Sequence, residues 1–133
     1  MILVTAATGQ VGGQLLNRLV DRDEPVRVVV RDPDRLAREL RDRVEVVEGS
    51  HGHPDVVAKA LVGADALFWL VPANPKADSI EAAYVGFSQA VADALPDSGI
   101  RHVVNISALG RGTAVADRAG HVTASLAVDD LLV

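Results

Sequence analysis

A glycine-rich turn near the start of the chain has the residue types and the spacing that bind phosphate. The segment Thr5-Ala6-Ala7-Thr8-Gly9-Gln10-Val11-Gly12 lies between an apolar run and a run with helical spacing. Gly9 lets the backbone approach a pyrophosphate, and Gly12 lets the helix pack closely on the strand. The free N–H groups and the positive dipole end of that helix favour an anion. We therefore expect Thr8, Gly9, Gln10, Val11 and Gly12 to bind a dinucleotide, with a purely geometric strand-to-helix turn as the alternative.

Two arginines follow the second apolar run, about 20 residues beyond the turn. Arg31 comes directly after Val26–Val30, and Arg35 follows about one helical turn later. An acidic residue here bonds the ribose 2′-hydroxyl of NAD, whereas an arginine accommodates the 2′-phosphate of NADP. The sequence therefore favours NADP as the cofactor. An exposed Arg31 that pairs with Asp32 or Asp34 is the alternative, and a register shift that placed Asp32 at this position would favour NAD.

Short β-branched runs alternate with helical patterns along the whole chain, which is typical of parallel α/β architecture. We expect strands at Ile2–Val4, Val26–Val30 and residues 44–47, 66–71 and 101–106. Helices are expected after the glycine turn and over residues 32–41, 54–62, 77–95 and 120–132, with a loop at 110–119. Right-handed crossovers then give one doubly wound Rossmann domain over residues 1–133, with the strand order 3-2-1-4-5.

Five further segments resemble, in order, the atypical short-chain dehydrogenase family, in its NmrA-like and NAD(P)H:quinone-reductase-like branch. They are Val28-Val29-Val30-Arg31-Asp32-Pro33, Val46-Val47-Glu48-Gly49, Gly63-Ala64-Asp65-Ala66, Asn105-Ile106-Ser107-Ala108-Leu109-Gly110 and Gly120-His121-Val122-Thr123-Ala124-Ser125-Leu126. The turn itself is similar to the family's Thr-Gly-x-x-Gly-x-x-Gly motif. The resemblance implies a Rossmann fold and a nicotinamide cofactor.

The resemblance also implies roles for residues that follow the third and fourth strands. Ser50 stands where the family carries an aspartate that holds the adenine, and a serine hydroxyl can still bond the adenine ring. Val71 and Pro72 correspond to the backbone that lines the nicotinamide ribose, and Asn74 can donate to the ribose or to a substrate.

Two residues are catalytic candidates by the same resemblance. Ser107 occupies the family's serine position, where it can bond a substrate carbonyl, although serines at strand ends are as often structural. His121 heads the last helix and can reach the nicotinamide side, or it can be an ordinary surface residue. The Tyr-x-x-x-Lys pair of typical members is absent, because Tyr84 is the only tyrosine and no lysine follows it at that spacing. Tyr84 lies on an apolar face of the expected helix, which favours packing in the core or at an interface over catalysis.

Two further departures from the family concern the turn and the chain length. Ala6 replaces the first glycine of the motif, and an alanine is strained there if the position needs a positive φ. Family members usually continue for another hundred or more residues, so we interpret the chain either as a truncated fragment or as a minimal domain without the family's C-terminal substrate region. If nothing replaces the missing sixth strand, we expect one edge of the sheet to be exposed.

Composition excludes several other classes of function. The net charge of −5 gives no general attraction to nucleic acid or to an anionic membrane, and the absence of cysteine excludes thiolate chemistry. No apolar run approaches the length of a membrane span, so we expect a cytoplasmic protein. His51 and His53 have no third ligand at a suitable spacing, which predicts solvated loop histidines and no metal site.

These patterns together predict an NADPH-dependent reductase that transfers hydride to a quinone or a similar carbonyl acceptor, because such a site needs little acid–base apparatus. A non-catalytic NADP(H)-sensing or partner-binding regulatory protein is the alternative. We also expect a homo-oligomer, held through helices 77–95 and 120–132 by an uncovered apolar face around Tyr84 and Phe87.

Overall fold

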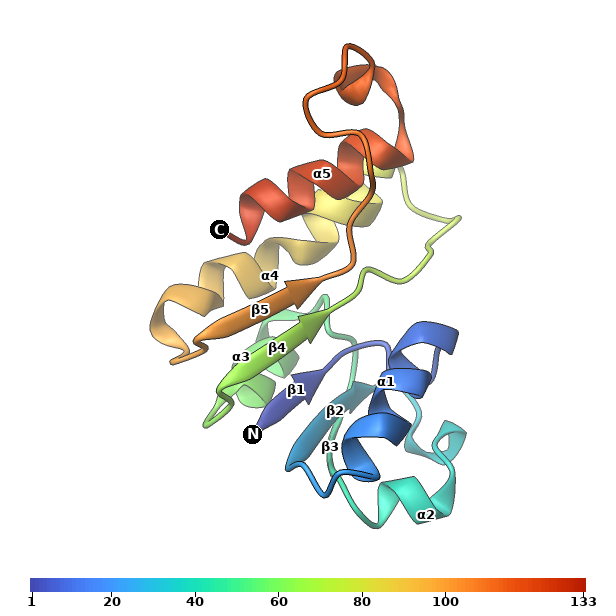
Figure 1. Cartoon of the computed structure of the whole chain (residues 1–133), viewed down its shortest axis with the longest axis vertical. Helices are drawn as coiled ribbons and strands as arrows, with labels where there is room; N and C mark the ends of the chain where they lie inside the picture. Colours follow the sequence, from blue (N-terminus) through green and yellow to red (C-terminus); the bar gives the residue numbers. More distant parts are fainter.

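The computed structural model describes residues 1–133 and contains a five-stranded parallel sheet. The strands lie in the order β3-β2-β1-β4-β5, which confirms the order expected from the sequence (Figure 1). Their bounds are β1 Ile2–Val4, β2 Val26–Val30, β3 Glu45–Glu48, β4 Ala66–Trp69 and β5 His102–Asn105. The central strand β1 pairs with β2 on one side and with β4 on the other, and its Val4 lies opposite Val28 of β2 and Phe68 of β4. The carboxyl ends of all five strands therefore meet at one edge of the sheet.

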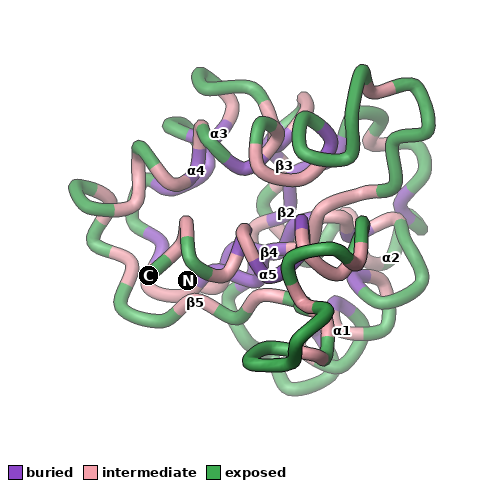
Figure 2. Tube along the Cα trace, turned by 90° about the horizontal axis from the view of Figure 1, so that it is seen from above, coloured by how far each residue is buried: buried purple, intermediate pink, exposed green.

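Helices cover the two faces of the sheet as separate layers (Figure 1). One layer holds α1 (Gln10–Val20) and α2 (Arg38–Arg41), and the other holds α3 (Pro54–Leu61), α4 (Phe87–Ala94) and α5 (His121–Leu131). Shorter turns complete the chain: 3₁₀-helices η1 (Pro33–Arg35), η3 (Leu95–Asp97) and η4 (Ala116–Arg118), and the π-helix η2 (Ala82–Gly86). The sheet carries a core on each face, and the buried residues gather between the layers (Figure 2).

Two expected helices differ from the structure. The helix expected over 32–41 is wrong: η1 and α2 are separated by Leu36 and Ala37, which are extended with ψ of 137° and 139°. Leu36 is buried, so the break inserts this side chain into the core. The helix expected from residue 77 begins later, because the Ser79 hydroxyl accepts the N–H of Ala82 and so caps the segment that leads into η2 and α4.

The remaining differences are shifts of one or two residues at the ends of elements. The strands expected at 44–47, 66–71 and 101–106 are observed as β3, β4 and β5, and the helices expected at 54–62 and 120–132 as α3 and α5. The expected loop at 110–119 contains the short η4. β4 ends at Trp69 because the next N–H, that of Leu70, bonds the hydroxyl of Thr5.

One region of the sheet has no helix over it. Val104 of β5 is 58% exposed and Val11 of α1 is 49% exposed, beside a groove of about 460 Å³ between α1 and the β4–β5 pair. β5 is also an edge strand, as the sequence led us to expect. No helix combines the length and the apolar character needed to cross a membrane.

Candidate functional site

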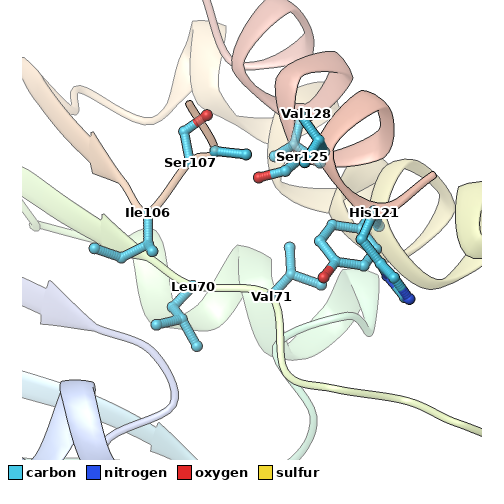
Figure 3. Close-up of a pocket in the computed structure, with 10 residues that line it drawn as sticks. Leu70, Val71, Ile106, Ser107, His121, Ser125 and Val128 are labelled. Carbon is cyan, nitrogen blue, oxygen red and sulfur yellow. The ribbon is translucent and has the colours of Figure 1, made fainter. Parts of the chain in front are cut away.

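Two cavities lie at the carboxyl edge of the sheet. The turn-side cavity has a volume of about 230 Å³ and is lined by Ala6, Thr8, Gly9, Val29, Val30, Arg31, Arg35, Gly49, Ser50, His51, Pro72 and Phe87. The helix-side cavity has a volume of about 320 Å³ and is lined by Leu70, Val71, Tyr84, Ile106, Ser107, Ala108, His121, Val122, Ser125 and Val128 (Figure 3). The segment after β4 borders both, through Val71 on one side and Pro72 on the other. Ligands of open α/β sheets bind in this crevice.

The glycine turn has the geometry of a phosphate cradle. Ala6 has a φ of +52°, and its carbonyl oxygen accepts the N–H of Gly9 at 2.9 Å. A Cβ on Gly12 would lie 2.3 Å from that same oxygen, so only glycine lets α1 begin this close to the strand. Gly9, the N-cap of α1, offers no side chain to its N–H groups, and the first turn carries no acidic residue. The first N–H groups of α1 therefore remain available to an anion.

A buried threonine fixes this turn to the end of the neighbouring strand. The Thr5 hydroxyl donates to the carbonyl oxygen of Phe68 at 3.0 Å and accepts the N–H of Leu70 at 3.0 Å. Thr5 is only 1% exposed, so both bonds are shielded from water. The glycine turn and the segment after β4 therefore keep a fixed separation.

Two free cations lie in the turn-side cavity. Arg31 and Arg35 line it and are exposed, and neither belongs to an ion pair of the chain. The carboxylate of Asp34 pairs with Arg41 at 2.6 Å, and the carboxylate of Asp32 accepts the N–H of Asp34. Neither Asp32 nor Asp34 therefore pairs with Arg31, which rules out the alternative of a neutralised Arg31 in this structure. Both guanidinium groups remain available to an anionic ligand.

His51 is buried, which corrects the expectation of a solvated loop histidine. Its Nε2 lies 3.1 Å from the carbonyl oxygen of Leu70, and its ring meets those of Trp69 and Phe87 edge-on at 5.1 and 4.9 Å. Burial lowers the pKa of His51 to about 4, the bond to Leu70 opposes this shift, and the positive charge of Arg31 adds to it. His51 is therefore a neutral imidazole near pH 7, and its Nε2 carries the proton because a carbonyl oxygen only accepts.

The same packing corrects the expectation of an uncovered apolar face. Phe87 is half-buried against His51 and Trp69, and a Cβ on Gly52 would lie 2.5 Å from its ring. Tyr84 is also half-buried, and its ring lies 5.8 Å from that of His121 on α5. This face is therefore covered within one chain.

Ser107 lines the helix-side cavity, but its hydroxyl is turned away from it (Figure 3). The hydroxyl donates to the carboxylate of Asp129, which also accepts the amide of Asn105 at 2.7 Å and lies 3.4 Å from Arg111. Burial alone would raise the pKa of Asp129, yet these hydrogen bonds and the charge of Arg111 together lower it. Ser107 therefore joins β5 to α5 in this conformation.

The predicted site residues fall into three groups. Thr8, Gly9, Arg31, Arg35, Ser50 and Pro72 line the turn-side cavity, and Val71, Ser107 and His121 line the helix-side cavity. The other four lie outside both: Gln10 is exposed at the start of α1, Gly12 is buried beneath the turn, Val11 faces the groove by β5, and Asn74 lies in the exposed loop after β4 with its side chain bonded to the N–H of Lys76.

Among the polar side chains that line the two cavities, His51, Tyr84 and Ser125 were not predicted as site residues, and Tyr84 was expected only to pack. Ser125 lies in the helix-side cavity, one helical turn beyond His121. That spacing places both on one face of α5, so the helical period was the signal that would have found it. His51 gave no such signal, because its ring partners are 18 or more residues away in sequence.

The parallel sheet has the strand order 3-2-1-4-5, and α1 begins at its carboxyl edge without a capping side chain. These two features define a dinucleotide-binding Rossmann domain. The family model described as NAD(P)H-binding matches residues 6–130, and the chain belongs to that family. A curated relative, the (4-alkanoyl-5-oxo-2,5-dihydrofuran-3-yl)methyl phosphate reductase of Streptomyces griseus, is 42% identical over 108 residues, covering 80% of this chain and 34% of the relative. The NAD(P)H azoreductase of Xenophilus azovorans is 31% identical over 111 residues, covering 83% of this chain and 36% of the relative.

Solved structures show the same fold. The triphenylmethane reductase of Citrobacter sp., complexed with NADP(H), superposes with a TM-score of 0.80 at 24% identity, over 99% of this chain and 45% of that one. The NADPH-dependent quinone oxidoreductase of Escherichia coli, complexed with NADPH, gives a TM-score of 0.76 at 21% identity, over 99% and 44%. The chain thus spans about a third of the length of the two curated relatives and under half of these structures.

Proposed function

We propose that the chain is the cofactor-binding part of an NADPH-dependent reductase whose acceptor is a quinone or a similar carbonyl compound. The observation that carries the proposal is the pair of unpaired cations, Arg31 and Arg35, in the cavity that also contains the glycine turn. A phosphate on the adenosine ribose would meet two guanidinium groups there, and a 2′-hydroxyl has no acidic partner in that lining.

In this proposal, different residues at the carboxyl edge bind different parts of NADPH and of the acceptor. The N–H groups at the start of α1 hold the pyrophosphate, Arg31 and Arg35 hold the 2′-phosphate, and Ser50 lies on the adenine side. Val71 and Pro72 form the wall between the two cavities, and the helix-side cavity, mostly apolar, receives the acceptor. NADPH, when bound, supplies the hydride, and the chain orients the acceptor and excludes water around it.

The test is NADPH oxidation, followed by absorbance, in the presence of quinones, azo dyes and triphenylmethane dyes. We expect turnover with at least one carbonyl acceptor and slower turnover with NADH. Tight NADPH binding without oxidation by any acceptor would exclude the reductase.

One observation favours the alternative, an NADP(H)-binding regulatory protein without catalysis. The hydroxyl of Ser107, the one expected to bond a substrate, is already bonded to Asp129. A sensor would keep the turn-side cavity intact and would need nothing from Ser107. The acceptor assay separates the two functions, because a sensor binds NADPH and does not oxidise it.

A further inference from the structure

Ser125 is a buried residue whose hydroxyl has no hydrogen-bond partner in the chain and opens onto the helix-side cavity. The residue is 9% exposed, on the face of α5 that packs toward the sheet. Its hydroxyl makes no hydrogen bond to the chain and points into the helix-side cavity, toward the space between Ile106 and Val71 (Figure 3). The oxygen is accessible from the cavity, so it can donate a hydrogen bond to a ligand atom there.

A second hydroxyl belongs to the same cavity. Tyr84 lines it from η2, the π-helix that precedes α4, and its ring is held against His121 at 5.8 Å. Single π-turns in helices are frequent at functional sites, because the extra residue redirects a side chain. The ring of Tyr84 is packed like that of a core residue. Its phenol hydroxyl makes no hydrogen bond to the chain and is free to donate one to a ligand.

Most of the remaining lining of the cavity is apolar. Its other walls are Leu70, Val71, Ile106, Ala108, Val122 and Val128, together with His121 and with Ser107, whose hydroxyl is turned toward Asp129. A volume of about 320 Å³ suits a ring system of one or two fused rings. The cavity therefore offers mostly apolar walls, two hydroxyl donors and the imidazole of His121.

We infer that Ser125 and Tyr84 are substrate-binding residues that donate hydrogen bonds to the carbonyl oxygen of a flat aromatic acceptor such as a quinone. This inference rests on the proposed reductase function and assigns the residues that bind its acceptor. Ser125 and Tyr84 fix the direction of the carbonyl, and Val71 and Ile106 hold the ring. No proton transfer is needed for this role.

The test compares the binding of 1,4-naphthoquinone and naphthalene, which share their rings and differ in the carbonyl oxygens. Binding is measured by calorimetry on the protein loaded with NADP⁺, which has no hydride to give. The chain has no cysteine with which the quinone could react. We expect the wild type to bind naphthoquinone at least tenfold more tightly than naphthalene. Ser125→Ala and Tyr84→Phe should each weaken naphthoquinone binding about five- to tenfold and leave naphthalene unchanged.

Ser98→Ala is the matched control, because Ser98 bonds the carbonyl of Leu95 at the opposite end of the sheet and lines neither cavity. Naphthoquinone binding within twofold of wild type in both variants overturns the inference, as does a wild type with no preference for the quinone. If Tyr84→Phe does not fold, Ser125→Ala alone decides. A preserved binding pattern without NADPH oxidation by any acceptor would overturn the reductase proposal and leave this binding site in place.

Discussion

The carbonyl oxygen of Ala6 lies beneath Gly12, where a Cβ on residue 12 would come within 2.3 Å of it. The carbonyl carbon of Ala6 would lie only 2.8 Å away, and neither atom can rotate aside because both are backbone. Ala6 presents this carbonyl by adopting a φ of +52°, a conformation that strains an alanine. The strain at residue 6 and the missing side chain at residue 12 are therefore two parts of one close contact.

Gly12→Ala should destabilise the chain by about 1–3 kcal/mol, because the added carbon forces α1 away from the turn. NADPH binding should weaken at least tenfold as the N–H groups of α1 move. Urea unfolding and calorimetry measure the two effects. Gly86→Ala is the control, since a Cβ there meets nothing within 4 Å and its φ of −58° is helical. Equal stability of the two variants would contradict the contact.

Ala6→Gly should stabilise the chain by about 1 kcal/mol, because relief of the left-handed strain exceeds the added entropy of the unfolded state. The melting temperature should rise by a few degrees, and NADPH affinity should stay the same or increase. The control is Ala7→Gly, at a buried alanine without a positive φ, which should lower the melting temperature. A clear loss of NADPH binding in Ala6→Gly would show that the turn is not the phosphate site.

Arg31→Ala should remove most of the preference for NADPH over NADH. A charge-assisted bond of about 1.5–3 kcal/mol corresponds to a ten- to hundredfold change in the dissociation constant for NADPH. The constant for NADH should change little. Calorimetry with both cofactors gives the ratio, and Arg38→Ala serves as the control because Arg38 is exposed and pairs only with Asp42. Equal constants for both cofactors in the wild type would end the NADP assignment.

Stability should fall as the pH drops from 6.5 toward 4, because the folded chain holds His51 neutral with a pKa of about 4. The unfolded chain takes up a proton near pH 6.5, so the stabilisation present above that pH is lost below it, by about 3 kcal/mol at pH 4. His51→Gln should lack this component, whereas His53→Gln, at an exposed residue, should retain it. Parallel unfolding curves for all three proteins across this pH range would refute the assignment.

Association remains a prediction, and the structure moves the expected interface. Helices α4 and α5 already pack within one chain, whereas parallel sheets normally have both faces covered and the groove beside Val11 and Val104 is open. We expect two copies to pair through this groove, so light scattering should give twice the mass of one chain. Val104→Asp should return it to a monomer, and Val62→Asp, at an exposed residue away from the groove, should not.

The sheet order and the turn could be predicted because they depend on short-range patterns and on handedness. Apolar strands, helical spacing and right-handed crossovers leave few arrangements for five strands. The break at Leu36 could not be predicted, because nothing local shows that one leucine must enter the core. The surroundings of His51 and Ser125 form only in the folded chain. Folding brings Trp69 and Phe87 against His51, and it brings the carboxyl ends of β4 and β5 near Ser125.

Trp69 is the only tryptophan of the chain, and it lies in β4 with its indole N–H bonded to Ser88 and its ring against His51. Tryptophan emission from this chain therefore comes from one residue, at the carboxyl end of β4 and beside His51 of the turn-side cavity. An imidazolium ion quenches a neighbouring indole, and a reduced nicotinamide absorbs where an indole emits. Protonation of His51 and binding of the reduced cofactor should therefore each lower the fluorescence of Trp69, the first by quenching and the second by energy transfer. Both events can be followed without a label on the protein.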